Sequence, residues 1–304
     1  MNKYITYIEK NDLGLIYLNK TFKEITTIKI GGRISLLFYP NSTFSFIKFY
    51  RYFIKYNDYN LIVIGNGSNI LANDNDFSGI VVSFKLINEI KVYNQYVTVT
   101  SGYQSVKLAK ILKYLNLAGG EFLSVIPGTI GGIVTMNASS YNSSISDILY
   151  ECLCIDEQGA VKWIRKTDME LKYRSSIFKK GKFIILKVCL KLKKGNSEEI
   201  QKLVNKYIIN KNATQPLDQN SAGSVFKNPH GYKAWKLIKD LNIKSKYPDI
   251  EVADKHKNFI INKNNAKASD VYKLVNEIRK KALDEYNINL ECEWTFINFN
   301  ENKN

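Results

Sequence analysis

Three loops rich in glycine and small polar residues interrupt the chain at widely separated positions. They comprise residues 65–69 (GNGSN), 126–132 (IPGTIGG) and 221–229 (SAGSVFKNP). Glycine permits turns with a positive φ and lets the backbone approach a ligand closely, and successive N–H groups in such turns attract anions. The loops therefore indicate a fold that can bind a cofactor or substrate carrying phosphate.

Common nucleotide-binding and hydrolase motifs do not explain these loops. In the first loop, Ile70 stands where a dinucleotide fingerprint needs its third glycine, and no acidic residue follows at the required distance. The second loop lacks the Gly-Lys-Ser/Thr of a phosphate loop. In the third, Phe226 stands two residues after Ser224, where a hydrolase elbow has glycine. An ordinary strand-to-turn connection remains an alternative for the first two loops, and a serine acting as proton donor remains open for the third.

The apolar pattern between the loops predicts a mixture of helices and short strands. Leu108, Ile111, Leu112 and Leu115 share one helical face, whereas Val97 and Val99 alternate with threonines as in a strand. The predicted helices comprise residues 43–56, 105–116, 197–210, 232–241 and 269–286. The predicted strands comprise residues 61–64, 79–84, two segments within 89–101, 148–155, 160–164, 183–192, 258–262 and 288–299, with loop-rich structure at 124–146 and 214–231. This order predicts an α+β fold with a domain boundary at Gly195-Asn196.

The chain is strongly basic, which invites a nucleic-acid-binding hypothesis. Its 304 residues include 44 Lys and Arg against 28 Asp and Glu, a formal net charge of +16. The excess is spread along the chain, and only five of the basic residues are Arg, the side chain suited to base readout and bidentate phosphate contacts. A solvated, Lys-rich surface is the favoured interpretation, and nucleic-acid binding is a less favoured alternative.

The lengths of the apolar runs and the positions of the cysteines indicate in which cellular compartment the protein is expected. Early charges break any signal-peptide core, and no run approaches the roughly 18 apolar residues of a membrane span. A soluble, cytoplasmic protein is therefore expected. Cys152, Cys154 and Cys189 fall in predicted strands without metal-type spacing, so we expect buried free thiols and no metal site.

Six motifs, taken in order, resemble one family. They are residues 27–32 (TIKIGG), 65–69 (GNGSN), 126–132 (IPGTIGG), 173–176 (YRSS), 223–229 (GSVFKNP) and 290–293 (LECE). Together they are similar to UDP-N-acetylenolpyruvoylglucosamine reductase, also called UDP-N-acetylmuramate dehydrogenase. The short spacing between the third loop and the C-terminus resembles the type II form of that enzyme.

The resemblance implies a flavoenzyme of peptidoglycan precursor synthesis. Its fold would be a two-subdomain FAD-binding module of the PCMH or vanillyl-alcohol-oxidase type, at residues 1–85 and 86–195. An α+β substrate-binding domain would follow at residues 196–304. NADPH would reduce FAD and leave, and UDP-N-acetylglucosamine enolpyruvate would then enter the same cleft and be reduced to UDP-N-acetylmuramate, which is a ping-pong reaction. A monomer without nucleic-acid partners is expected.

The resemblance also implies roles for individual residues. Arg174 would stabilise the charge that develops on the substrate, Glu293 would do so as a protonated acid, and Ser224 would protonate the carbanion. The residues expected to hold FAD are Asn66, Gly67, Ser68, Asn69, Gly128, Thr129, Gly131, Gly132 and Asn137. Those expected to bind the substrate are Tyr173, Lys227 and Asn228.

Alternatives and departures from the family pattern accompany these roles. Arg174 could be an ion-paired arginine at a strand end, and Glu293 could face solvent while Glu291 is buried. The chain has Val125 and Ile133 where the family usually has Gly and Ala, and residues 139–142 (SSYN) replace a run of small residues. Residues 248–254 also depart from the usual pattern. A divergent or inactive flavin-binding relative is therefore a second hypothesis.

Overall fold

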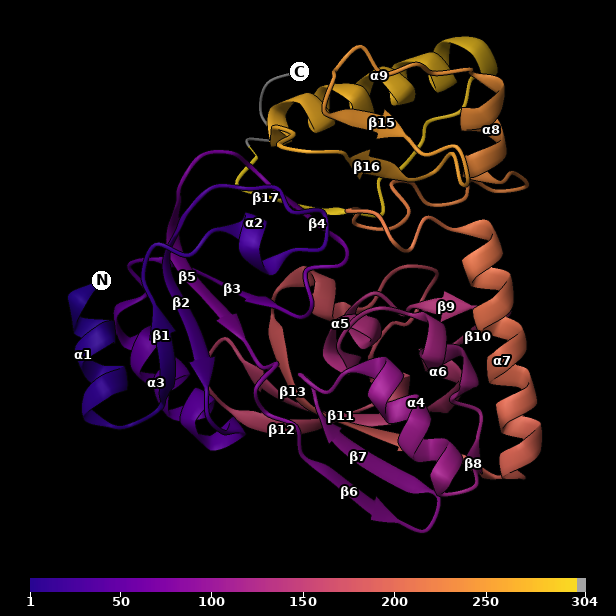
Figure 1. The fold of residues 1–304 in the computed structure, drawn as a ribbon. Coiled ribbons are helices and arrows are strands. Elements are labelled where there is room, and N and C mark those ends of the chain that lie inside the picture. Colours follow the sequence, from indigo (N-terminus) through magenta and orange to yellow (C-terminus); the bar gives the residue numbers. More distant parts are fainter. Residues whose placement is uncertain (300–304) are drawn as a thin grey trace. The chain divides into compact units, whose positions relative to one another are not determined.

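The computed structural model describes residues 1–299, and the chain forms two compact units (Figure 1). Unit 1 comprises residues 1–18, 36–66 and 78–211, and unit 2 comprises residues 19–35, 67–77 and 212–304. Two short segments of the N-terminal third thus cluster with the C-terminal part of the chain. The division into residues 1–85, 86–195 and 196–304 stays a prediction.

The first sheet of the chain has the strand order β1-β2-β5-β3. Its strands are β1 (Gly14–Tyr17), β2 (Ile34–Pro40), β5 (Phe77–Ser83) and β3 (Asn60–Ile64), with β3 and β5 parallel. Helices α1 (Asn2–Lys10) and α3 (Thr43–Tyr56) contribute aromatic side chains to the core of this part of unit 1. The Ser42 hydroxyl begins α3 by accepting a hydrogen bond from the Ser45 N–H at 3.0 Å.

The second sheet of unit 1 is antiparallel, in the order β12-β11-β13-β7-β6. Its strands are β6 (Ile90–Tyr93), β7 (Tyr96–Thr100), β11 (Leu149–Asp156), β12 (Val161–Arg165) and β13 (Phe183–Lys191). Helix α4 (Ser105–Tyr114) packs on it through Leu108 and Leu112. Cys152, Cys154 and Cys189 are buried free thiols, as expected, and burial raises the pKa of Cys154 to about 12.

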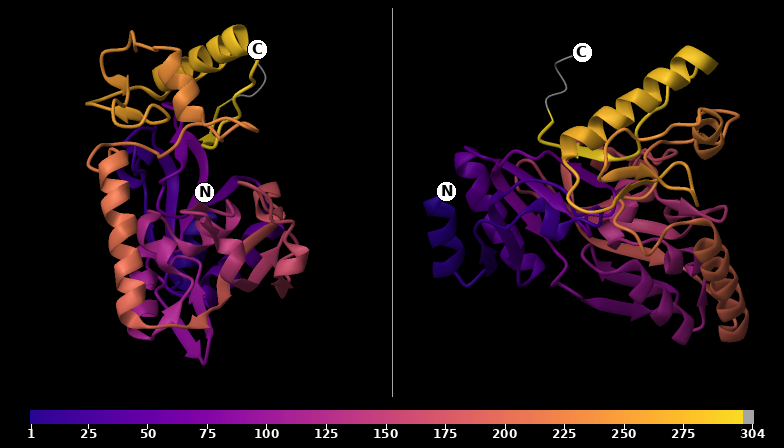
Figure 2. Two further views of the ribbon diagram at one scale, coloured as in Figure 1. Left: turned by 90° about the vertical axis from the view of Figure 1, so that its right-hand side faces the viewer. Right: turned by 45° about the horizontal axis from the view of Figure 1, so that its top comes forward.

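The chain between α4 and β11 contains several short elements, and it includes the stretch 124–146, where loop-rich structure was expected. They are β8 (Leu117–Ala118), the 3₁₀ helix η1 (Glu121–Val125), α5 (Ile130–Thr135), β9 (Ser139–Ser140), β10 (Ser143–Ser144) and α6 (Ile145–Ile148). The stretch 124–146, expected to be rich in loops, thus contains a short helix and a hairpin, because tertiary contacts stabilise helical structure in this glycine-containing sequence. After β13 come β14 (Lys193–Lys194), which pairs with β8, and the continuous helix α7 (Ser197–Thr214) (Figure 2).

Unit 2 is built around the long helix α9 (Ala268–Tyr286) (Figure 2). Its other elements are α2 (Phe22–Ile25), β4 (Ile70–Ala72), α8 (Ala234–Asp240), the antiparallel pair β15 (Ile250–Val252) and β16 (Ile260–Asn262), and β17 (Thr295–Ile297), which pairs in parallel with β4. A strand over 288–299 was expected, but only β17 forms. The left-handed Asn287 ends α9, and the buried Leu290 and Trp294 hold the segment between them against the core.

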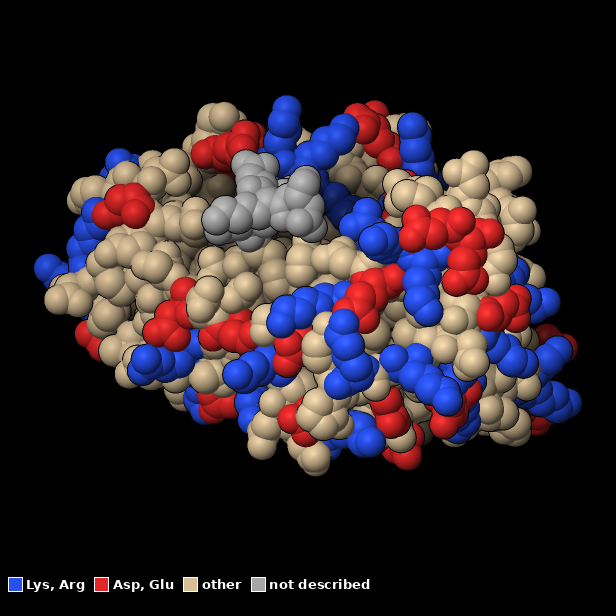
Figure 3. Space-filling model, turned by 90° about the horizontal axis from the view of Figure 1, so that it is seen from above, with Lys and Arg blue, Asp and Glu red and all other residues tan. Residues whose placement is uncertain are grey.

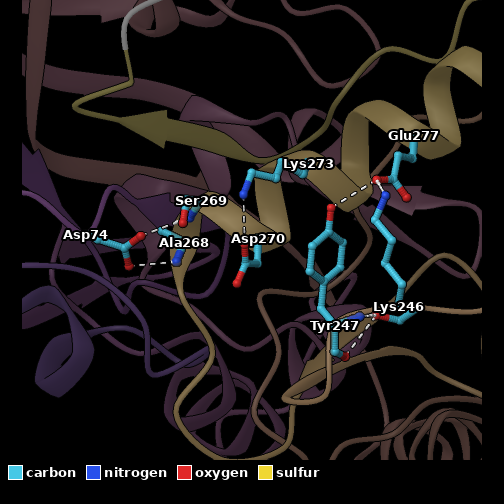
Figure 4. A network of polar contacts seen from close by, with 9 residues as sticks. Asp74, Lys246, Tyr247, Ala268, Ser269, Asp270, Lys273 and Glu277 are labelled. Atoms are coloured by element: carbon cyan, nitrogen blue, oxygen red, sulfur yellow. Dashed lines mark hydrogen bonds and ion pairs between the residues drawn. The ribbon is translucent and has the colours of Figure 1, made fainter.

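Polar contacts fix the start and the middle of this unit's long helix (Figure 4). The Asp74 carboxylate accepts hydrogen bonds from the N–H groups of Ala268 at 2.7 Å and Ser269 at 3.0 Å. Farther along α9, Glu277 accepts from Tyr247 at 3.0 Å and pairs with Lys246 at 2.7 Å. The hydrogen bond from Lys246 lowers the pKa of Glu277. Asp74 therefore ties the 67–77 segment to the start of α9.

Charged side chains are interspersed on the face of the molecule that Figure 3 shows, with Lys and Arg beside Asp and Glu. Such mixing is typical of a solvated surface. Within residues 1–299, no helix is both long and apolar enough to cross a membrane. Among those same residues, no cluster of three or more His, Cys, Asp or Glu side chains suits a metal ion.

Candidate functional site

The second glycine loop is held against the segment that follows β7. The N–H groups of Ile130 and Gly131 donate to the carbonyls of Tyr103 at 2.9 Å and Ser101 at 2.8 Å. In the opposite direction, the Ser105 N–H donates to the carbonyl of Gly128 at 3.1 Å. These bonds hold the start of α5, so the backbone of residues 128–132 has a defined position.

Glycines in this region leave space that a side chain would fill. A Cβ on Gly65, at the end of β3, would lie 2.4 Å from the hydroxyl oxygen of Thr129, so the first two loops meet at this pair. A Cβ on Gly131 would lie 2.7 Å from the Cβ of Ser101. At Gly132 the nearest atom is the Thr129 hydroxyl oxygen at 3.6 Å, which is ordinary contact. Gly65 and Gly131 are therefore required by packing, whereas the space beside Gly132 is open.

Buried polar atoms around this loop lack protein partners. In the described part of the chain, Ser83 Oγ, Ser101 Oγ and Asn137 Oδ1 are buried without a hydrogen-bond partner. Buried polar atoms are nearly always paired, so such atoms point to a bound group. FAD carries ribityl hydroxyls and a diphosphate, and the open space at Gly132 beside unpaired donors and acceptors fits such a group. The residues present therefore fit the cofactor that the sequence predicts.

Arg174 lies in a tight turn that is fastened to the end of α5. Lys172 and Ser175 exchange backbone hydrogen bonds of 3.1 Å in both directions, and Arg174 between them has φ 53°. The Asn137 amide donates to the Lys172 carbonyl at 3.0 Å, and the Ser176 hydroxyl donates to the Thr135 carbonyl at 2.7 Å. Arg174 thus belongs to a turn and not to a strand end, and it lies near Asn137.

The tip of this turn carries two of the predicted site residues. The guanidinium of Arg174 donates from Nη1 to the hydroxyl of Ser139 at 2.8 Å. Its Cζ also lies 5.2 Å from the ring centroid of Tyr173, which is exposed. Sequence reasoning treated Ser139 only as a departure from the family pattern, and no sequence signal linked it to Arg174.

The first glycine loop continues into unit 2, where it contacts the third loop. The Thr27 N–H donates to the Gly67 carbonyl at 3.2 Å, and the Thr27 hydroxyl donates to the Ser221 carbonyl at 2.7 Å. The side-chain amide of Asn69 donates to the carbonyl of Glu293 at 3.0 Å. Asn69, assigned to FAD binding from the sequence, therefore also holds the backbone of the predicted catalytic glutamate.

Ser224 lies on a backbone segment between two neighbours. On one side, the Glu293 N–H donates to the Val225 carbonyl at 2.7 Å, and Phe226 pairs with Cys292. On the other side, Ser224 pairs with Phe259. The structure therefore brings the backbones of Ser224 and Glu293 together within unit 2.

Asn258 supports this arrangement and was missed by sequence reasoning. Its side chain is 4% exposed, donates to the Phe226 carbonyl at 2.8 Å and accepts from the Phe226 N–H at 3.0 Å. Its carbonyl accepts from the Val225 N–H at 2.8 Å. The available signal was an asparagine at the start of a predicted apolar strand, a place where a buried amide needs specific partners.

The third loop ends in residues that already have partners inside unit 2. Lys227 Nζ lies 2.6 Å from Glu291 Oε2, and Glu291 is exposed whereas Glu293 is half-buried. The alternative in which Glu291 is the buried acid was therefore wrong. The Asn228 side-chain oxygen accepts from the Ala234 N–H at 3.0 Å, at the start of α8.

The predicted residues thus fall into two groups. Unit 1 holds Asn66, Gly128, Thr129, Gly131, Gly132, Asn137, Tyr173 and Arg174, and unit 2 holds Gly67, Ser68, Asn69, Ser224, Lys227, Asn228 and Glu293. Within each unit, hydrogen bonds or close packing connect most members of the group. The chemical role of each of these residues remains a prediction.

Comparison with known proteins gives a consistent result along the chain. Residues 34–165 match the family described as FAD binding domain, and residues 215–297 match UDP-N-acetylenolpyruvoylglucosamine reductase, C-terminal domain. A UDP-N-acetylenolpyruvoylglucosamine reductase from Clostridium tetani is 36% identical over 98% of both chains. Another from Caldanaerobacter subterraneus is 34% identical over 92% of this chain and 93% of the relative.

A solved structure agrees with the sequence relatives. The UDP-N-acetylenolpyruvylglucosamine reductase of Thermus caldophilus superposes with a TM-score of 0.78 and 28% identity, covering 93% of this chain and 98% of that one. The match confirms the expected α+β fold with an FAD-binding module and a C-terminal domain. This chain belongs to the UDP-N-acetylenolpyruvoylglucosamine reductase family of FAD-binding oxidoreductases.

Proposed function

We propose that the protein reduces UDP-N-acetylglucosamine enolpyruvate to UDP-N-acetylmuramate with NADPH, in peptidoglycan precursor synthesis. One hydride and one proton saturate the enolpyruvyl double bond, and NADPH becomes NADP⁺. The two substrates use the site one after the other. Family membership supports the reaction. The hydrogen bond from the Glu293 N–H to the carbonyl of Val225, the residue after Ser224, is the observation that carries the assignment of residues.

FAD, when bound, supplies the hydride that is added to the double bond. Thr129, Gly132 and Asn137 are the residues proposed to hold it in unit 1, because Thr129 and Gly132 border open space and the Asn137 side chain carries an unpaired buried oxygen. In unit 2, Gly67 has φ 65°, and a Cβ there would lie 2.5 Å from the Ile25 carbonyl oxygen. The first loop therefore keeps its shape only with glycine at this position.

Arg174 and Glu293 are proposed to stabilise the negative charge that develops on the substrate carboxylate. A guanidinium presents several fixed donors to a carboxylate, and Arg174 is held in a turn that limits its backbone motion. Glu293 must be protonated to donate a hydrogen bond in this role. The Glu293 carbonyl accepts from Asn69 and its N–H donates to the Val225 carbonyl, so the backbone from which the carboxyl group extends is held in place.

Ser224 is proposed to give the proton to the carbanion. A serine hydroxyl is a weak acid, so the transfer requires a strongly basic carbanion and an accurately placed oxygen. The pairing of Ser224 with Phe259 and the Asn258 amide bonds to Phe226 hold this backbone on one side, and the bond from the Glu293 N–H to the Val225 carbonyl holds it on the other. Such support is what a positioned proton donor needs.

The two half-reactions test the proposal separately. Anaerobic NADPH should bleach the flavin absorbance of the purified protein, and UDP-N-acetylglucosamine enolpyruvate should restore it. Ser224→Ala should bleach at the wild-type rate and recover at least about a hundredfold more slowly, because a general acid contributes roughly 10²–10⁴-fold.

A matched control is Ser221→Ala, which changes a serine in the same loop whose hydroxyl accepts from the Gly223 N–H at 3.2 Å. It should leave both half-reactions close to the wild type. A protein purified without flavin absorbance, and unable to take up FAD, would contradict the proposal. Normal recovery in Ser224→Ala would exclude serine as the donor while leaving the reaction itself intact.

A further inference from the structure

We propose that Ser139 is a positioning residue that sets the orientation of the Arg174 guanidinium for the reduction step. This inference rests on the proposed function, because it assigns to Ser139 a part in the proposed role of Arg174. Ser139 belongs to none of the motifs that identify the catalytic residues in the sequence. Its link to Arg174 exists only in the folded chain.

The contact itself is short and charge-assisted. Arg174 Nη1 donates to Ser139 Oγ at 2.8 Å, within the range of strong hydrogen bonds to a charged donor. The turn of residues 172–175 fixes the backbone of Arg174. Its side chain still has several rotatable bonds, and a guanidinium acts on a carboxylate only when its plane is correctly turned. A hydroxyl at Ser139 supplies a fixed point far along that side chain.

Ser139 can serve as a fixed point because it lies in a short, closed hairpin. Ser139 pairs with Ser144, and Ser140 pairs with Ser143. The connecting residues Tyr141 and Asn142 have φ 51° and 61°, the positive values of a tight two-residue turn. A hydrogen bond from the Ile145 N–H to the Ala138 carbonyl, at 3.0 Å, closes the open end of the hairpin.

The hairpin is also anchored to helix α7 (Figure 1). The rings of Tyr141 and Tyr207 are stacked with centroids 4.2 Å apart and planes 4° apart. The Tyr141 hydroxyl donates to the Tyr207 carbonyl at 3.0 Å. Because both an aromatic stack and a hydrogen bond hold Tyr141, the position of Ser139 is set by α7 and not by the turn alone.

The residue type at position 139 matters for this contact. The family resemblance implies a small residue at position 139. A glycine or alanine there would have no side-chain oxygen to accept a hydrogen bond from a guanidinium. The run SSYN contains both the hydroxyl that Arg174 binds and the tyrosine that anchors the hairpin. Ser139 and Tyr141 therefore act together, since the tyrosine holds the hairpin that presents Ser139 to Arg174.

The test compares Ser139→Ala with Ser140→Ala, the same change one residue along the same short strand. The FAD of each protein is reduced anaerobically with stoichiometric dithionite, and reoxidation by UDP-N-acetylglucosamine enolpyruvate is followed by stopped flow. Reduction by NADPH is measured in parallel. We expect Ser139→Ala to slow reoxidation roughly ten- to hundredfold, the effect of losing a hydrogen bond to a charged group. Reduction by NADPH and both rates of Ser140→Ala should stay near the wild type.

Several outcomes would overturn the inference. Unchanged reoxidation in Ser139→Ala would do so, and so would equal slowing of both half-reactions, because the serine would then act on the cofactor. If Ser139→Ala does not fold, Ser139→Thr and Ser139→Val replace it as a pair of similar shape in which only Thr keeps the hydroxyl. Thr should then reoxidise at least about tenfold faster than Val, and equal rates would overturn the inference. A wild-type protein that the enolpyruvyl substrate does not reoxidise would instead overturn the proposed function.

Discussion

The ammonium group of Lys211, near the end of α7, donates a hydrogen bond to the backbone carbonyl of Val125, the last residue of η1. Val125 directly precedes the loop of residues 126–132, so this contact connects the helix to the entrance of the proposed cofactor loop. Burial lowers the pKa of Lys211 from 10.5 to about 8. Burying the charged form of Lys211 therefore costs desolvation free energy.

This relationship predicts a specific dependence of stability on pH. Between pH 8 and 10.5 the unfolded chain binds more protons at Lys211 than the folded chain, so this residue makes stability rise with pH in that window. The free energy of unfolding of the wild type, minus that of Lys211→Met, should therefore increase between these values. Urea unfolding followed by circular dichroism measures both. Lys202→Met, at an exposed position of α7, should show no such increase, and a flat difference for Lys211→Met would contradict the prediction.

We expect substitution of the two adjacent glycines of α5 to have different effects, one on stability and the other on FAD binding. A Cβ on Gly131 meets the Cβ of Ser101 at 2.7 Å, so Gly131→Ala should destabilise the protein by about 1–3 kcal/mol. Gly132→Ala meets no protein atom closer than 3.6 Å and should leave the FAD-free protein as stable or slightly more stable. The same methyl fills the space proposed for FAD. Thermal unfolding without FAD and a flavin fluorescence titration separate the two effects, and unchanged FAD affinity in Gly132→Ala would show that the cofactor lies elsewhere.

Asp74 predicts a local change in stability at the start of α9. Its carboxylate accepts from the N–H groups of Ala268 and Ser269, which have no partner inside the helix. Asp74→Ala should destabilise unit 2 by about 1 kcal/mol and speed hydrogen exchange at these two amides. Asp270→Asn removes a surface pair with Lys273 and a charge in the first turn of α9 but keeps the Asp74 carboxylate, so exchange at the Ala268 and Ser269 amides should stay near the wild type. Equal exchange rates in Asp74→Ala and wild type would rule out the cap.

Lys227 and Glu291 predict opposite shifts in the KM for the UDP-sugar. If Lys227 binds an anionic group of the substrate, Lys227→Met should raise this KM about tenfold or more while leaving reduction by NADPH unchanged. Glu291 is exposed and pairs with the same ammonium at 2.6 Å, so it competes with a substrate anion. Glu291→Gln should lower the KM by up to about threefold, a modest change because exposed ion pairs are weak. If neither substitution changes the KM, Lys227 has a structural role and does not bind the substrate.

Local pattern was enough to predict most of the regular elements. The apolar faces of α3, α4 and α9 have the spacing of a helix, and each of these helices forms where that spacing occurs. The strands of the second sheet were predicted for the same reason, because alternating or continuous apolar runs have few other stable conformations next to a core. The predictions departed from the structure at 124–146 and 288–299, and no element was predicted before residue 43, where α1, β1, α2 and β2 form.

Those two segments show why local pattern failed. Helix α5 contains Gly131 and Gly132, which disfavour helix, but the Gly131 N–H is bound by the distant Ser101 carbonyl and the apolar side chains around it are buried. At the C-terminal end, alternating residues suggested a strand, but Leu290 and Trp294 pack into the core of unit 2 and only Thr295–Ile297 find a partner strand. In both cases long-range contacts outweigh local preference.

The order of the motifs determined the family, and with it the residue types at the proposed site, because those motifs are local stretches of sequence. The tertiary structure alone decided which of these stretches meet. It joined Gly65 to Thr129, Asn69 to Glu293, and Ser139 to Arg174, pairs separated by between 35 and 224 residues in the chain. A hydrogen bond between distant residues depends on the paths of all the elements that carry them, and no local spacing encodes those paths. The sequence therefore determined the chemistry available to this protein, and the packing within each unit determined how that chemistry is oriented.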